Sequence, residues 1–210
     1  VSRNAVVLDM RSFNKKTLNE ETKVMTVQSG ATWHDIQKFL HPKYAVKAMQ
    51  STDIFTVGGS ISVNAHGMDH QVGSLHNTIR AIRIMHPSGE IEEVSPTKNP
   101  ELFKLVIGGY GLFGIILDAD IEVTDNTIYE TSRKIINYTE FTDYFNSQIA
   151  SNADYGLMYS HLSTAPGSFL KEMILYTYKT DPGPHSEIPP LGEVSNERLR
   201  RFVINFAKSG

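Results

Sequence analysis

The segment of residues 56–67, with the sequence TVGGSISVNAHG, constrains this chain more than any other part of it. A glycine pair such as Gly58-Gly59, placed after a β-branched residue, lets the backbone turn with φ > 0 and brings its N–H groups close to a ligand. The polar side chains of the segment suit phosphate oxygens, and they are Thr56, Ser60, Ser62, Asn64 and His66. The alternative is a tight turn that leads into a buried helix or strand, because the segment matches neither the dinucleotide GxGxxG pattern nor a Walker loop.

A second glycine-rich segment, residues 107–116 with the sequence IGGYGLFGII, leads directly into an alternating run at 115–123 that predicts a strand. Glycines this dense before a strand suggest a flat, bulky ligand lying on the main chain. The alternative is a helix packed closely against a sheet. Two such segments in one domain favour a large cofactor that carries a pyrophosphate and a ring system.

Composition restricts the chemistry of the chain. Its 210 residues are 40% hydrophobic and 20% charged, with a net charge of −3 and no cysteine. Redox chemistry therefore requires a bound organic cofactor or a metal held by histidine and carboxylate. The histidines are scattered rather than paired at ligand spacing, so we expect no metal site. The charge gives no footprint for nucleic acid, and no apolar run reaches the ~20 residues of a membrane helix.

Hydrophobic spacing predicts an α+β fold. Thr32 and Asp35 form a capping box that starts a helix with Trp33 in the core, and this helix ends before Pro42. Asn99 caps a second helix. The predicted strands are 6–8, 24–28, 79–84, 91–94, 115–123, 155–162 and 172–178, and a third helix is predicted at 141–149.

Two groups of side chains are interpreted as structural. Asp118 and Asp120 share one face of the strand at 115–123, which predicts a solvated face. Alternating tyrosines in the last third of the chain predict one face of a sheet, with a substrate wall as the alternative. These tyrosines are Tyr155, Tyr159, Tyr176 and Tyr178.

Several motifs in a fixed order resemble a known family. The order is TVGG–S–x–S–x–N–x–HG, then NTIRAIRIMHPSGEIEEVSP, then NPELFKLVIGGYGLFGIILDADIEVT. It resembles the PCMH-type FAD-binding domain of the vanillyl-alcohol oxidase and p-cresol methylhydroxylase flavoproteins. Within that family it is most similar to the branch of aldonolactone and alditol oxidases and decaprenylphosphoryl-ribose oxidase. The resemblance covers roughly residues 5–125 and, more weakly, 126–180.

The resemblance implies FAD as the cofactor and two domains. Residues 1–125 are expected to be an FAD-binding domain without its N-terminal βαβ piece, and residues 126–210 part of a substrate, or cap, domain built on an antiparallel sheet. Val1 is not an initiator Met and the last residues, RFVINFAKSG, look structured, so an internal fragment of a longer enzyme, itself inactive, is expected. The strands missing from that domain would leave a sheet edge unpaired, so we expect a homodimer through this edge.

The flavin contacts of the family carry over position by position. The loop at 56–59 matches the one that meets the pyrophosphate through its N–H groups, and the stretch at 63–66 matches the one that continues under the cofactor. His66 is also the expected catalytic residue, because an imidazole can transfer a proton near neutral pH and the resemblance places it near the flavin and the substrate. The resemblance places the family's substrate-activating base in a C-terminal part outside this chain. The alternative for His66 is a hydrogen bond to its own loop. The expected cofactor-binding residues are Ser51, Thr56, Val57, Gly58, Gly59, Val63, Asn64, Ala65, His66 and Ile116.

The function that the resemblance implies is that of an FAD-dependent oxidoreductase. Such an enzyme oxidises an alcohol carbon of a sugar, alditol or aldonolactone-like substrate by hydride transfer to flavin. Val63 and Asn64 differ in polarity from the residues of the ribose-oxidase branch, so the identity of the substrate does not transfer. The expected partner is this small molecule, and the expected location is the cytoplasm. The competing hypothesis is a non-catalytic module, derived from a flavin domain, that binds a nucleotide or a partner.

Overall fold

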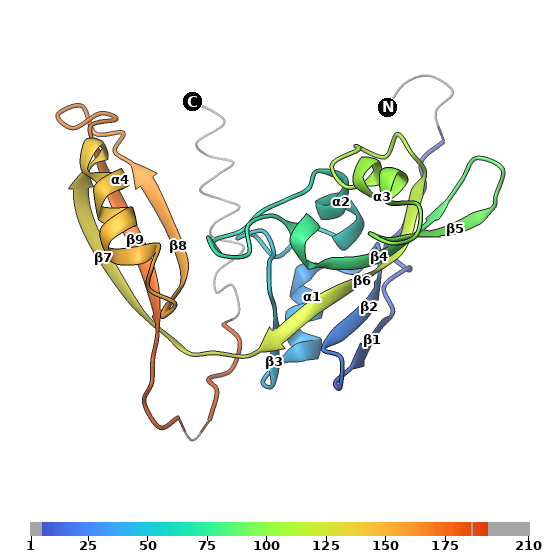
Figure 1. Cartoon of the computed structure of the whole chain (residues 1–210), viewed down its shortest axis with the longest axis horizontal. Coiled ribbons are helices and arrows are strands. Elements are labelled where there is room, and N and C mark those ends of the chain that lie inside the picture. The colour runs from blue at the N-terminus through green and yellow to red at the C-terminus, as the bar shows by residue number, and fades with distance from the viewer. Residues whose placement is uncertain (1–5, 186, 193–210) are drawn as a thin grey trace, which may run out of the picture.

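The computed structural model describes residues 6–185 and 187–192, which form two antiparallel sheets with short helices (Figure 1). The predicted α+β class is confirmed, whereas the interpretation of residues 201–210 as structured lies outside the described residues. The first sheet contains β1 (Lys16–Asn19), β2 (Val24–Gln28), β3 (Tyr44–Val46), β4 (Ile79–Met85), β5 (Ile91–Val94) and β6 (Ile115–Asp125). The second contains β7 (Tyr129–Asn137), β8 (Tyr155–Leu162) and β9 (Glu172–Thr180). The helices are α1 (Trp33–Leu40), α2 (Val57–Ser62), α3 (Pro100–Val106) and α4 (Phe141–Tyr144), with 3₁₀ turns η1 (Leu75–Thr78) and η2 (Tyr138–Glu140) and a π turn η3 (Phe145–Ile149).

Strand β6 holds the first sheet together. The sheet has the order β1-β2-β6-β4-β5, and β3 pairs with the C-terminal end of β6. Successive side chains of a strand point to opposite faces, so one set of β6 residues lies in the core. Ala119, Ile121 and Val123 belong to this set and share a hydrophobic core with Trp33 of α1 and Ile61 of α2.

Helix α1 forms as its sequence predicts. Thr32 accepts a hydrogen bond from the N–H of Asp35, and the Asp35 carboxylate accepts one from the N–H of Thr32, so the predicted capping box is confirmed. Trp33 is fully buried, and its indole N–H donates to Ser60 Oγ of α2 over 2.9 Å. The tryptophan therefore anchors α2 as well as filling the core.

The first predicted strand is wrong. Residues 6–8 have no regular structure and are exposed. The strand that precedes β2 and pairs with it is β1, in a register that runs from Lys16↔Val27 to Asn19↔Val24. Elements β1, β3 and β7 had no prediction, and α2 matches the alternative of a turn that leads into a buried helix or strand. Along β7, with the sequence YETSRKIIN, Ile136 is the buried position, so this edge strand lacks the apolar alternation that reveals a strand in a sequence.

The second sheet has its own core. Ile136, Ile149, Met173 and Leu175 form this core on the face that packs against α4 and η3. The amphipathic helix predicted at 141–149 is therefore confirmed in place, although its second half is a π turn.

The tyrosines of the second sheet divide between its two faces. Tyr159 stacks on Tyr176 with ring centroids 4.7 Å apart and lies 6.2 Å from the Tyr178 ring, so these three share a face as predicted. Tyr155 was predicted on the same face, and this is wrong. The register of β8 shifts between Tyr155 and Leu157, and Tyr155 packs against the core on the other side. A one-residue shift reverses the side to which a strand residue points.

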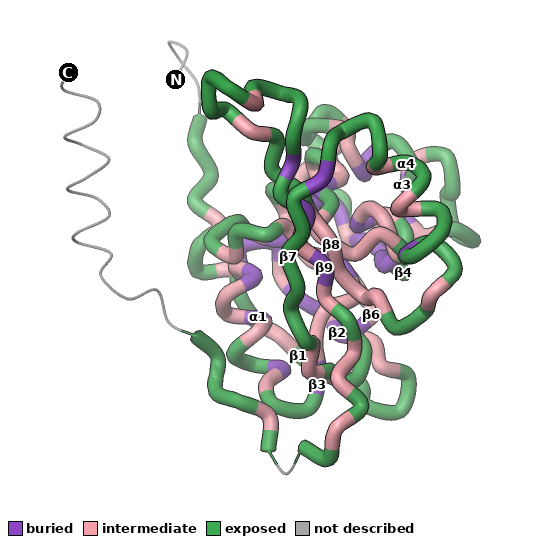
Figure 2. The backbone as a smooth tube through the Cα atoms, turned by 90° about the vertical axis from the view of Figure 1, so that its left-hand side faces the viewer, coloured by how far each residue is buried: buried purple, intermediate pink, exposed green. Residues whose placement is uncertain are grey.

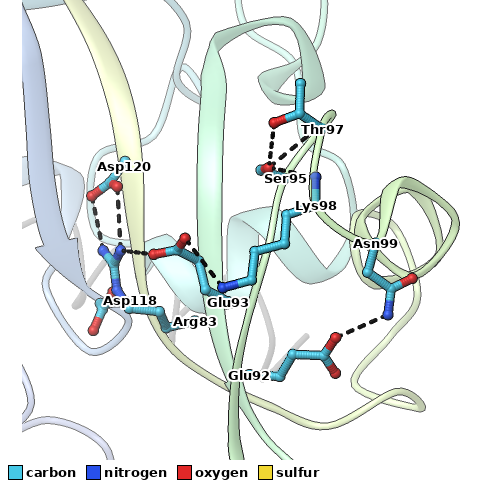
Figure 3. A network of polar contacts seen from close by, with 9 residues as sticks. All are labelled: Arg83, Glu92, Glu93, Ser95, Thr97, Lys98, Asn99, Asp118 and Asp120. Atoms are coloured by element: carbon cyan, nitrogen blue, oxygen red, sulfur yellow. Dashed lines mark hydrogen bonds and ion pairs between the residues drawn. The ribbon is translucent and has the colours of Figure 1, made fainter.

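Asp118 and Asp120 do not form the solvated face that the sequence predicts. Strand β4 places Arg83 opposite them, and its guanidinium hydrogen-bonds both carboxylates, with 2.8 Å from Nη2 to Asp120 Oδ1 (Figure 3). Thr26 also donates to Asp120 over 2.6 Å, and Glu93 extends the network. The two aspartates are thus half-buried members of a polar network on the sheet.

The two carboxyl groups respond to this network in opposite ways. Burial raises the pKa of Asp118, and the hydrogen bond from Arg83 only partly offsets it. Burial would also raise the pKa of Asp120, but hydrogen bonds from Arg83 and Thr26 together outweigh it, so the pKa of Asp120 lies below its ordinary value of 3.8. The same network raises the pKa of Arg83, through Asp120 first.

We expect Asp120→Asn to lower the free energy of unfolding by about 1 kcal/mol at neutral pH. A lowered folded-state pKa stabilises the fold above pH 3.8, and this contribution is lost as the pH falls through the folded-state value, so the difference from wild type should shrink in acid. Asp118→Asn is the matched control. The raised pKa of Asp118 means that its ionisation opposes folding, so Asp118→Asn should lower the free energy of unfolding by less than Asp120→Asn does at neutral pH. Urea titrations at acidic and at neutral pH measure the stability of both variants. Equal losses of stability would contradict the different roles given to the two aspartates.

Candidate functional site

The glycine pair of the first segment lies inside helix α2, not in a turn with positive φ. Gly58 and Gly59 are absent from the positive-φ positions among the described residues, so that part of the prediction is wrong. Gly58 is required for a different reason. A Cβ atom there would lie 2.8 Å from the Cβ of Ser29, closer than real side chains approach. The glycine lets α2 sit directly on the end of β2.

The backbone N–H groups at the start of α2 are largely engaged within the protein. The N–H of Val57 donates to Ala31 O over 2.9 Å, and that of Gly58 donates to Ser29 O over 2.8 Å. The N–H of Gly59 makes a longer bond of 3.3 Å to the capping hydroxyl of Thr56. Gly59 is exposed, so among these three N–H groups it offers the best access to an anion.

The two glycine-rich segments meet at the other end of α2. The N–H of Gly108 donates to Ile61 O, and the N–H of Tyr110 donates to Ser62 O, each over 2.9 Å. Gly108 has a φ of 78°, which suits glycine, and a Cβ there would lie 3.4 Å from that of Asn64. Segments about 50 residues apart in the sequence are thus hydrogen-bonded to each other, as one extended cofactor site requires.

His66 belongs to the first of these segments and is exposed. Its Nδ1 is 3.3 Å from the carbonyl oxygen of Gly67. A carbonyl only accepts, so this contact is a hydrogen bond when Nδ1 carries the proton, and the neutral ring then has a lone pair on Nε2. In that tautomer Nε2 faces no protein partner among the described residues and is able to accept a proton.

His66 also begins the loop that contacts the second sheet. A bridge between His66 and Ser74 closes the loop at its base. At its tip, the carbonyl of Met68 accepts from the N–H of Met158 in β8 over 2.8 Å. The ring of His70 packs edge-on against Phe145, with centroids 5.9 Å apart. A ligand above His66 would therefore lie close to the junction of the two sheets.

The predicted cofactor residues differ in what they present to a ligand. Ile116, on β6, is buried with Val57 and Ala65, so these three contribute through backbone or packing. Asn64 has a φ of 46°, and its side-chain oxygen accepts from the N–H of His76, which ties the segment to η1. The exposed members are Ser51, Gly59, Val63 and His66.

A cavity of about 610 Å³ lies between the two sheets. It is lined by residues 44–51 and by parts of 68–72, 124–129 and 153–157. Ser51 is the predicted cofactor residue on its wall. The volume falls within the range of about 300–1,000 Å³ that small-molecule sites occupy.

Two exposed apolar side chains beside α2 had no prediction. Tyr110 is 75% exposed and Leu112 is 83% exposed, both in the turn that follows α3. Such side chains suit a flat apolar ring, and the dense glycines around them were the signal that could have identified them.

In the described part of the chain, no group of three or more histidine, aspartate or glutamate side chains is arranged to hold a metal. Among the same residues, none of the helices has the length and apolar character needed to span a membrane.

Comparison with known proteins supports a flavin site. Residues 1–95 match the family model described as an FAD binding domain. The chain is 32% identical over 123 residues to decaprenylphosphoryl-beta-D-ribose oxidase of Mycolicibacterium smegmatis, which covers 57% of this chain and 27% of that protein. It is 32% identical over 142 residues to D-arabinono-1,4-lactone oxidase of Yarrowia lipolytica, covering 67% and 27%. It is 24% identical over 220 residues to FAD-dependent monooxygenase yanF of Aspergillus niger, covering 95% and 36%.

These relatives are much longer than the chain, which spans about a third or less of each. The family match covers both the loop that includes Ser51 and the glycine segment of α2. The names of the relatives point to different substrates and reaction types. FAD appears in the name of the family model and in that of the monooxygenase.

Proposed function

We propose that the chain belongs, through residues 1–95, to the PCMH-type FAD-binding flavoproteins and that it is part or all of an FAD-dependent oxidoreductase. We further propose that it oxidises an alcohol carbon of a sugar, alditol or aldonolactone-like molecule. Two relatives named for a ribose and a lactone substrate support this substrate class.

The observation that carries the proposal is the joining of the two glycine-rich segments around α2. Gly59, near the start of the helix, is exposed, and its N–H makes only the 3.3 Å bond to Thr56. At the other end Tyr110 bonds Ser62, and the exposed side chains of Tyr110 and Leu112 offer apolar surface to a ring. A dinucleotide with a pyrophosphate and a flat ring system has these two parts, so the residues present fit FAD. When bound, this cofactor supplies the acceptor for a hydride.

His66 is proposed to act on the substrate proton. With Nδ1–H held by the Gly67 carbonyl, Nε2 accepts or holds the proton of a substrate hydroxyl. The exposed position of His66 next to the loop that touches β8 supports this role.

We propose residues 1–125 as the FAD-binding domain and residues 126–210 as part of a cap over the substrate. The end of β6 at Asp125 and the separate core of the second sheet support this boundary. The tyrosine face formed by Tyr159, Tyr176 and Tyr178 is then available as one wall of the substrate site.

The test is the purified full-length protein. We expect it to carry the yellow flavin spectrum, and the flavin to be bleached anaerobically by at least one polyol, sugar or lactone of a panel. Bleaching only by phenols, amines or hydroxy acids would contradict the substrate class but keep the flavoprotein.

The competing candidate is a non-catalytic binding module. The engagement of the Val57 and Gly58 N–H groups by protein carbonyls favours it, because these donors are not free for a pyrophosphate. A colourless full-length protein that does not take up added FAD would support the module and overturn the enzyme.

A further inference from the structure

The carboxamide of Gln50 lies in the wall of the cavity between the two sheets, directly before Ser51 in the chain. We propose that this carboxamide donates a hydrogen bond to an acceptor atom of FAD, and that Ser60 and Trp33 fix its orientation. The inference rests on the proposed flavin site and adds residues to it. Gln50 contacts the cofactor, whereas Ser60 and Trp33 are positioning residues that act through Gln50.

The hydroxyl group of Ser60 is buried and is engaged by the protein. Ser60 is 1% exposed, so it does not face a phosphate as its segment of the sequence suggests. Its Oγ accepts the indole N–H of Trp33 over 2.9 Å and donates to Oε1 of Gln50. Helix α1 carries Trp33 on its buried side, and Figure 2 shows the buried positions of this helix between more exposed ones. One line of hydrogen bonds therefore joins α1, α2 and the segment that precedes α2.

The direction of these hydrogen bonds follows from the tryptophan. An indole N–H only donates, so Ser60 Oγ accepts from Trp33, and the single hydroxyl proton of Ser60 goes to Gln50. Gln50 therefore has to present its Oε1 to Ser60. With the amide turned over, its NH₂ group would face Ser60 Oγ, and within the described part of the chain the buried hydroxyl proton would have no acceptor. Leaving a buried donor unpaired is costly, which selects the first orientation.

This orientation leaves the Nε2 of Gln50 with two N–H donors and no protein acceptor among residues 6–185 and 187–192. In that part of the chain, the buried side-chain atoms without a partner belong to Ser29 and His70, so Nε2 is accessible at the cavity wall. The carboxamide thus offers donors only. Its complement is an acceptor, such as the phosphate oxygens and the ring carbonyls of FAD.

The neighbours of Gln50 connect it to the proposed flavin site. Ser51 is the next residue and is an expected cofactor contact. The backbone of Met49 lies against Gly67, which follows His66, and a Cβ at Gly67 would lie 1.9 Å from the Met49 carbonyl oxygen. Both stretches fall within the part of the chain that matches the FAD binding domain. The position of Gln50 therefore favours the cofactor as the partner of its N–H groups.

Removing the donor tests the contact in the full-length protein. Gln50→Met keeps the length of the side chain and removes both N–H groups, so the dissociation constant of FAD should rise about tenfold. Gln37→Met is the matched control, because Gln37 lines the same cavity but its carboxamide is not anchored by a hydrogen bond in the described part of the chain. The control should change the constant by less than about twofold. Titration of the apo-protein with FAD, followed by flavin fluorescence, measures both constants.

A double-variant cycle tests the positioning role of Ser60. Ser60→Ala removes the hydroxyl that holds Oε1, so the amide is no longer oriented and the dissociation constant of FAD should rise about threefold. In the Gln50→Met background, Ser60→Ala should have no further effect on FAD binding, because no amide is left to orient. A serine that only supports the fold would have the same effect on FAD binding in both backgrounds, and this result would overturn the positioning role.

Two further results would overturn the contact between Gln50 and FAD. One is a Gln50→Met protein whose dissociation constant for FAD equals that of the Gln37→Met control. The other is a Gln50→Met protein that binds FAD normally but unfolds at a lower temperature by circular dichroism, because its amide then bonds another part of the protein. A wild-type protein that binds no FAD would overturn the flavin site and this inference with it, so the two failures are distinguishable.

Discussion

Replacing Gly67 with alanine is expected to lower the free energy of unfolding by about 3 kcal/mol. Gly67 does not have a positive φ, so the cost does not come from backbone torsion. It comes from space, because an added Cβ would lie 1.9 Å from the carbonyl oxygen of Met49. A backbone atom cannot rotate away as a flexible side chain can, so the close approach of residues 49 and 67 has to open. Urea unfolding followed by circular dichroism measures the change.

Gly167→Ala is the matched control for this substitution. Gly167 lies in the loop between β8 and β9, has no neighbouring atom within 4 Å of an added Cβ and has no positive φ. We expect its free energy of unfolding to change by at most about 0.5 kcal/mol. If both variants were equally stable, the close approach of residue 67 to Met49 would not be the reason why residue 67 is a glycine.

In the full-length protein, His66→Ala is expected to lower the turnover number by about 10²- to 10⁴-fold while the flavin remains bound. The reason is the loss of Nε2 as proton acceptor, since the other ring nitrogen is held against Gly67 O. The variant should also lose the limb of the pH–rate profile that belongs to this base. Steady-state kinetics with an artificial electron acceptor, together with flavin absorbance, separates these effects.

His185→Ala is the control, because His185 pairs with Asp181 and lies outside both glycine segments. It should leave turnover within about twofold, which corresponds to less than ~0.5 kcal/mol in the barrier. A His66→Ala enzyme with near wild-type turnover and an unchanged pH profile would assign His66 to its own loop, the alternative that the sequence left open.

Where a structural signal is local, the sequence predicted it well. The capping box of Thr32 and Asp35 starts α1, and Asn99 with Pro100 starts α3. The hairpin of β4 and β5 has Gly89 at a φ of 86°. These features depend on residues three or four positions apart, whose geometry is set by the backbone itself.

The candidate site could be located from the sequence but not built. The glycine segments and His66 stood out by composition, and the family match agrees with a flavin domain. Whether each predicted residue touches FAD stays a prediction. No sequence pattern showed that the N–H groups of Gly108 and Tyr110 donate hydrogen bonds to the C-terminal end of α2 and so join the two segments.

The rest was decided by contacts between residues far apart in the chain. Gly58 is a glycine because Ser29 lies against it, and Asp118 is held in a network because β4 brings Arg83 across from it. Tyr155 changes face because one residue is inserted in its register with β9. Local propensity determines which segments become helix or strand, whereas the neighbours that give a glycine, an aspartate or a tyrosine its role are set only when the sheets assemble.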